Sequence, residues 1–255
     1  MNSNKNVCFC TIATGKPYRQ MTRDLAFDLQ KFANGVSFYV YTDVPDDFRD
    51  LENVTAFKYH QTGIQSCFND RRLVVQEALL NFPIAIHIDA DTKILEDLTD
   101  NLNFPVGITG YSEDLLKHMK KNRPRELNTV ETVAQKLEIP LEKSDWIGES
   151  LYVVTRDGGK EKEFIEYWGL IANYVELKGM HGGDGNLMGL AATKVGWKVN
   201  MTENWQQMRK KTVHTDASHS VKRSSWEQFQ RRVAFHYRLN KARLFALKDF
   251  DFYYR

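Results

Sequence analysis

The segment Ile84-Ala-Ile-His-Ile-Asp-Ala-Asp-Thr-Lys-Ile-Leu95 decides the fold, because it joins a short apolar run to two acidic residues. The run is too short to cross a membrane and has the length of a buried strand in a parallel sheet. Strand side chains alternate between faces, so Asp89 and Asp91 point the same way and can reach one object. Open α/β sheets bind ligands beyond the carboxyl ends of their strands. The segment predicts a divalent-cation site at a strand end, with a helix cap or a solvated turn as the alternative.

The sequence around this segment alternates strand and helix patterns. Strands are expected at 7–13, 36–43 and 53–59, and helices at 18–32 and 69–80, the second of which leads through Pro83 into the acidic strand. This alternation predicts an α/β fold with a doubly wound, mixed and mainly parallel sheet flanked by helices. The turn at Gly15 lacks the glycine spacing of a dinucleotide or P-loop fingerprint, but its backbone is still able to contact a nucleotide base.

Composition indicates one enzyme-sized domain covering residues 1–255. The chain is 42% hydrophobic and has a net charge of +2, which argues against a general nucleic-acid binder. Its three cysteines, Cys8, Cys10 and Cys67, form no disulfide framework and fit a buried core better than a zinc site. Because the sequence shows neither a signal peptide nor a membrane-length apolar segment, we expect a cytoplasmic protein, with peripheral membrane contact left open.

Two arginines stand in the first turn of the helix at 69–80. Arg71 and Arg72 oppose the helix dipole there, so they are poor choices for stability alone. They suit pairing with a phosphate or with the acidic residues at the end of the next strand, and a solvated surface position is the alternative. We therefore expect Arg71 to contact the ligand of the strand-end site.

Three phrases in the first hundred residues resemble the nucleotide-sugar glycosyltransferases of the GT-A fold, with retaining families six and eight the most similar. They are Cys10-Thr-Ile-Ala-Thr14, Tyr39-Val-Tyr-Thr-Asp-Val-Pro45 and His87-Ile-Asp-Ala-Asp91. The resemblance implies a nucleotide-binding half at 1–100 and an acceptor-binding half at 101–255. It also implies that Asp89 contacts ribose or metal, that Asp91 binds Mn²⁺ (or Mg²⁺), and that Thr11, Ala13 and Thr14 lie against the nucleotide.

The segment Met180-His-Gly-Gly-Asp-Gly-Asn-Leu-Met-Gly-Leu190 holds the expected catalytic residues. Its glycines let the backbone approach a ligand, and a helix is expected to start between Asp184 and Leu187. Asp184 then is either a helix N-cap or, as the resemblance implies, an acid beneath the sugar ring, where Asn186 would add hydrogen bonds. Family six has a glutamate directly after such an aspartate, whereas this chain has Gly185. A covalent intermediate is therefore in doubt, and front-face attack is easier to defend.

The remaining expected site residues come from two other parts of the second half. Trp146 and Glu149, within a strand pattern at 144–155, are expected to bind the acceptor, with core packing or a surface position as the alternative. In the basic C-terminal third, the resemblance to family eight implies a late histidine on the metal and a lysine on the diphosphate. His236 with Lys241 fits that arrangement, and His214 is the rival for the histidine.

Together these features predict a metal-dependent glycosyltransferase that moves a hexose from a nucleotide diphosphate donor to a sugar hydroxyl, with retention. We expect the nucleotide of the donor to be UDP. A phosphatase of the haloacid dehalogenase type ranks low, because Thr92 directly follows Asp91 instead of standing two positions after it. A nucleotidyltransferase of related fold lacks its usual glycine-rich basic loop. A carbohydrate- or RNA-binding protein without catalytic activity would use the basic, aromatic segment at 226–237.

Overall fold

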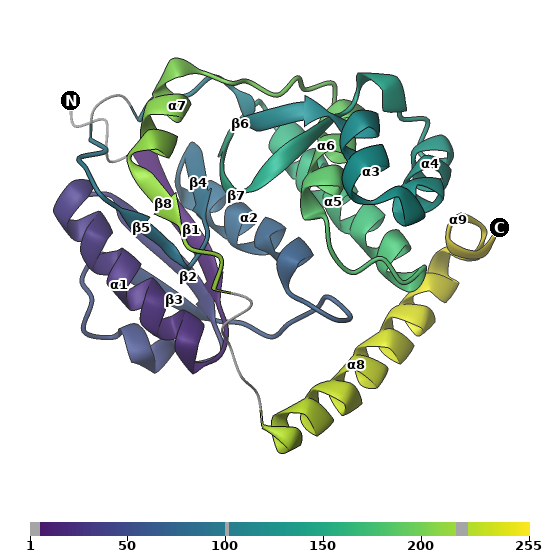
Figure 1. The fold of residues 1–255 in the computed structure, drawn as a ribbon, viewed down its shortest axis with the longest axis horizontal. Coiled ribbons are helices and arrows are strands. Elements are labelled where there is room, and N and C mark those ends of the chain that lie inside the picture. Colours follow the sequence, from purple (N-terminus) through teal and green to yellow (C-terminus); the bar gives the residue numbers. More distant parts are fainter. Residues whose placement is uncertain (1–5, 100–101, 218–223) are drawn as a thin grey trace.

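The computed structural model describes residues 6–99, 102–217 and 224–255, and its centre is a six-stranded sheet. The strand order is β3-β2-β1-β4-β7-β6. β1, β2, β3 and β4 run parallel, and only β7 runs against its two neighbours (Figure 1). The prediction of a mixed, mainly parallel sheet flanked by helices is confirmed. The strands of this sheet are β1 (Val7–Ala13), β2 (Ser37–Thr42), β3 (Val54–Lys58), β4 (Ile84–Ile88), β6 (Gly107–Asp114) and β7 (Asp145–Thr155).

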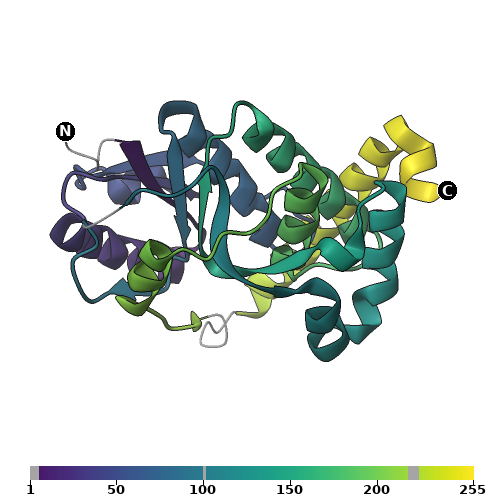
Figure 2. The ribbon, with the colours of Figure 1, turned by 90° about the horizontal axis from the view of Figure 1, so that it is seen from above.

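Helices cover both faces of the sheet, as Figures 1 and 2 show. On one face, α1 (Lys16–Phe32) and α7 (Glu203–Lys210) pack on side chains such as Phe9 and Ile86. The helices on the other face are α2 (Arg71–Asn81), α3 (Leu115–Asn122), α4 (Leu127–Lys136), α5 (Lys160–Leu177) and α6 (Asp184–Lys194). They enclose a core that includes Cys8, Cys10 and Trp168. Burial on both faces explains why β4 reads as an uninterrupted apolar run, since only such strands can dispense with a polar face.

Helix α6 lies unusually close to β7, and two glycines make the approach possible. A Cβ atom at Gly189 would lie 1.6 Å from the carbonyl oxygen of Asp145, and one at Gly185 would lie 2.2 Å from that of Ile147. Backbone cannot move aside as a flexible side chain can. The glycines therefore set how deeply the start of α6, with Asp184, enters the molecule.

We expect Gly189→Ala to lower the free energy of unfolding by about 3 kcal/mol or more, the upper end of the range for overpacking a core. Gly110→Ala is the matched control, because its Cβ would meet side-chain and backbone atoms no nearer than 3.4 Å. Urea unfolding of both variants measures the difference. Equal losses of unfolding free energy in the two variants would show that the close approach of α6 to β7 does not exclude a side chain at Gly189.

A second, two-stranded sheet joins distant parts of the chain. β5 (Thr92–Ile94), which directly follows the acidic segment, pairs antiparallel with β8 (Thr212–His214), and Thr92 stands opposite His214. The backbone N–H of Thr215 and that of Ala217 donate to the main chain and the side chain of Asp91, respectively. These bonds hold the segment that directly follows β8 against the turn that carries both aspartates.

The chain ends in a long helix on the outside of the molecule. α8 (Ser225–Ala246) begins with a capping box between Ser224 and Glu227, and α9 (Phe250–Tyr254) follows it. Figure 1 shows α8 along one edge, away from α1 and the first strands of the sheet. Among the described residues, no helix is both long and apolar enough to span a bilayer.

Candidate functional site

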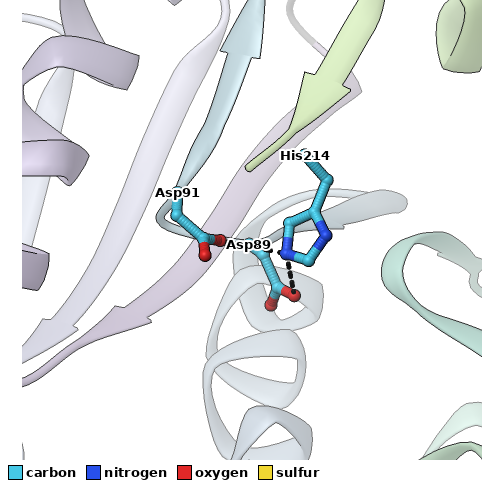
Figure 3. A group of neighbouring side chains, drawn as sticks. All are labelled: Asp89, Asp91 and His214. Carbon is cyan, nitrogen blue, oxygen red and sulfur yellow. Dashed lines mark ion pairs between the residues drawn. The ribbon is translucent and has the colours of Figure 1, made fainter. Parts of the chain in front are cut away.

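Asp89, Asp91 and His214 form a compact group at the carboxyl end of β4 (Figure 3). His214 Nε2 lies 3.1 Å from Asp91 Oδ1 and 3.4 Å from Asp89 Oδ2. One ligand atom from each of the three residues falls within 4.8 Å of the others. Two carboxylates and an imidazole suit a divalent ion such as Mn²⁺, so the donor set fits the expected metal. This group is the candidate metal centre.

The charges of this group are strongly coupled. Although burial opposes ionisation of Asp89, the Arg71 guanidinium and the hydrogen bond from His214 outweigh it and lower the pKa of Asp89 to about 2. Hydrogen bonds to Asp89 and then Asp91 raise the pKa of His214 to about 10. In the absence of a metal, a protonated imidazole thus holds the position that a cation would take between the two carboxylates.

Arg71 connects the metal centre to α6. Its Nη2 donates to Asp89 Oδ1 at 2.6 Å and its Nη1 donates to Asp184 Oδ2 at 2.8 Å. Burial opposes the arginine charge, but the carboxylates of Asp89 and Asp184 outweigh it and raise the pKa of Arg71. The expected surface alternative is thereby excluded for Arg71, whose side chain is only 12% exposed.

Glu149, on β7, lies against the start of α6. Its Oε1 accepts a hydrogen bond of 3.0 Å from the backbone N–H of Gly185, the residue after Asp184. Burial, and then the nearby charge of Asp184, raise the pKa of Glu149 well above its usual value, so the site favours the neutral form of this carboxyl group.

A cavity of about 400 Å³ opens in front of the metal centre. Arg71, Asp89, Asp91, Glu149 and His214 all line it. From β1 and the turn after it, Ile12 and Thr14 reach the cavity, whereas Thr11 and Ala13 are buried and are not among its lining residues. The alternation of side chains along a strand accounts for this difference.

A second cavity of about 510 Å³ adjoins the first, and Glu149 lines both. Trp146 lines only the second, where it stands with Tyr111, Met201 and Trp205. The Trp146 ring also stacks on His118, with centroids 4.2 Å apart and planes at 7°. Trp146 is thus only partly buried and presents an aromatic surface to a cavity, and Glu149 stands where the two cavities meet.

Other expected site residues lie farther from the cavities. Asp184 and Asn186 have no exposed surface and line neither cavity. The cap of α6 is Gly183, without a side-chain cap bond, so Asp184 does not serve as the N-cap. His236 and Lys241 are exposed on α8, and His236 is not part of the group around Asp89. Of the two histidines that the sequence left open, His214 is the one beside the aspartates.

Some residues of the first cavity were not expected from the sequence, among them His87, Tyr18 and Phe68. His87 is buried, its two ring nitrogens have no partner among the described residues, and burial followed by the charge of Arg71 lowers its pKa to about 3. Tyr18 and Phe68 add aromatic rings to the lining. His87 sits inside the quoted segment, where alternation places it on the same face as Asp89. The positions of Tyr18 and Phe68 carry no comparable signal, since both lie at the entry to helices.

Comparison with known proteins bears on the fold. No protein-family profile and no curated protein matches the chain. A solved structure of the bifunctional glycosyltransferase WbbM in its apo form matches 84% of this chain with a TM-score of 0.52 and 11% sequence identity. This chain spans about half of that structure, 46% of its length. The chain therefore has a glycosyltransferase-like fold, and its mixed sheet is consistent with the GT-A type.

Proposed function

We propose that the protein is a metal-dependent glycosyltransferase that moves a hexose from a UDP-linked donor to a sugar hydroxyl, with retention. The observation that carries this proposal is the convergence of Asp89, Asp91 and His214 on a cavity at a strand end, within a glycosyltransferase-like fold. A nucleotide diphosphate has the size and charge for that cavity, and a bound metal would stabilise the diphosphate as it leaves.

The residues of the two cavities support a division of the substrate between them. In the first cavity, Tyr18 and Phe68 offer aromatic faces for a base, and Arg71 offers a cation for the diphosphate. In the second, the Trp146 ring offers a face on which an acceptor sugar can stack. The hexose would then be transferred beside Glu149, the residue common to both cavities.

The raised pKa of Glu149 favours transfer without a protein nucleophile. A carboxyl group whose burial favours the neutral form is a poor attacking anion. In the proposed reaction the acceptor oxygen bonds the anomeric carbon on the face from which UDP leaves, and the departing phosphate takes the hydroxyl proton. Asp184, which lines neither cavity, positions Arg71.

The first test is metal-dependent binding of UDP. We expect Mn²⁺ to strengthen UDP binding by about tenfold or more in the native protein, and Asp91→Asn to abolish that gain, because the variant loses an anionic ligand. Isothermal titration with and without Mn²⁺ measures both. Asp24→Asn, at an exposed position of α1, is the control and keeps the gain. The metal role is overturned if UDP affinity is the same with and without Mn²⁺.

The pKa of His214 makes metal binding dependent on pH. Because the pKa of its imidazole is raised to about 10 without metal, a ligating His214 must lose a proton that it holds at neutral pH. We expect the affinity for Mn²⁺ to rise with pH between 6 and 9, with about one proton released per ion. Titrations in buffers of different ionisation enthalpy count the protons. In His214→Gln the release should vanish, and a release that persists would exclude His214 as a ligand.

A further inference from the structure

Helix α8 has two apolar faces, of which only one packs on the body of the protein. Its inner face includes the partly buried Phe235 and Leu239 and the fully buried Ala246. Phe235 contacts the ring of His181, and Arg238 Nε donates to the carbonyl oxygen of Ile64 at 3.0 Å. These contacts hold the helix in place and leave the opposite face to the outside.

The outer face carries a stripe of exposed apolar side chains, called here the outer stripe. It consists of residues that are each 54–69% exposed, Trp226, Phe229, Val233, Tyr237 and Leu244. Spacings of three, four and seven residues place them along one side of the helix, over a length of about 27 Å. Scattered exposed apolar residues are ordinary on a protein surface, but five along one side of one helix, with Asn240 between the last two, indicate an interaction site.

Arginine and lysine flank the outer stripe on both sides. By helical position, Arg232 and Arg243 lie along one side and Lys241 along the other, and all three are exposed. Neither Arg232 nor Lys241 forms an ion pair with a residue that the structure describes. Helix α8 contains five Arg and Lys residues but a single acidic residue, Glu227, whose side chain takes part in the capping box. The partner of this surface should therefore be anionic.

We propose that the outer stripe docks the protein on an anionic membrane surface. Helix α8 lies along one edge of the molecule (Figure 1), and the outer stripe runs along a single helix, which suits a flat partner. Apolar side chains, with Trp and Tyr among them, enter the boundary between headgroups and acyl chains, while the flanking cations meet anionic headgroups. A second copy of the chain fits less well, since its own basic flanks would face these cations.

Docking in this way has a consequence for the first cavity. Arg231, the residue next to Arg232 on α8, lines that cavity. Arg231 belongs by helical position to the inner face of α8, so a protein held through the outer stripe would keep this cavity one helix diameter, about 10 Å, from the bilayer surface. If the proposed function holds, an acceptor attached to a lipid would be within reach.

Vesicle co-sedimentation of the full chain tests the docking surface. We expect binding to vesicles of phosphatidylglycerol and phosphatidylcholine, and a fall in the partition coefficient of about tenfold or more in the double variant Trp226→Ser with Leu244→Ser. The matched control is Phe27→Ser with Leu80→Ser, at positions that are 51% and 62% exposed on other helices, and it should bind as the native protein does. Arg232→Gln with Arg243→Gln should lose roughly fivefold per charge removed, only on anionic vesicles.

Three results would overturn the proposal. They are the absence of native binding to any vesicle, equal binding by the stripe variant, and a dimer in analytical ultracentrifugation that the stripe variant dissociates without any vesicle binding. UDP affinity with Mn²⁺ is measured on the same samples and should be unchanged in the stripe variant. Vesicle binding without any UDP binding would refute the proposed function and leave the docking surface standing.

Discussion

Arg71→Met is expected to lower the free energy of unfolding by about 3–5 kcal/mol, the range for removing one partner from a buried ion pair. The loss follows from what stays behind, because the carboxyl groups of Asp89 and Asp184 would lose their shared cation in a place with little water. Asp184 is fully buried and the Asp89 side chain is only 14% exposed. Urea unfolding of metal-free protein measures the change.

A double variant and a surface control make this result specific. Arg71→Met with Asp184→Asn should recover part of the loss, since one of the two unpaired charges is gone. Arg49→Met removes an arginine paired with Asp46 on the surface, where the two side chains are 77% and 64% exposed, and should cause no measurable change. Equal losses in the single and double Arg71 variants would show that the charges of Arg71 and Asp184 are not coupled.

The second large effect concerns transfer and not stability. We expect Glu149→Ala to reduce transferase activity by about 10²-fold, because it removes a polar group from the junction of the two cavities. Glu149→Gln should stay within about threefold of the native rate, since its amide can accept from the Gly185 N–H as the carboxyl group does and is neutral. Release of UDP in the presence of an acceptor measures both.

The comparison of the two Glu149 variants separates two mechanisms. If Glu149→Gln is as inactive as Glu149→Ala, an ionised carboxylate takes part in the reaction and the proposal of front-face attack is wrong. Glu142→Ala, at an exposed position, controls for the general effect of losing an acid. Circular dichroism of each variant confirms that the comparison concerns folded protein.

Local sequence patterns predicted the part of the molecule that local physics determines. The strand at 84–88 and the placement of Asp89 and Asp91 follow from side-chain alternation and from apolar burial on both faces. The start of α6 at Asp184 follows from the glycines before it. None of these features requires knowledge of a distant partner.

The rest of the site depends on pairings between distant segments. His214 and His236 both lie in the basic C-terminal third, and the sequence analysis left both open as the metal-binding histidine. What places His214 beside Asp91 is the register of β8 against β5, a contact across about 120 residues that periodicity does not report. The role of Asp184 is similar: Gly183 caps α6, and Asp184 pairs instead with Arg71, which reaches it from the distant helix α2.

The pairing of β5 with β8 also determines when, during folding, the three residues of the candidate metal centre come together. His214 enters the metal centre only after a loop of about 120 residues has closed, and closing so long a loop is slow and entropically unfavourable. A nascent or partly folded chain therefore has the two aspartates without His214 beside them. If the proposed function holds, metal affinity should appear late in folding, together with the last tertiary contacts, and donor binding would wait until the chain is folded.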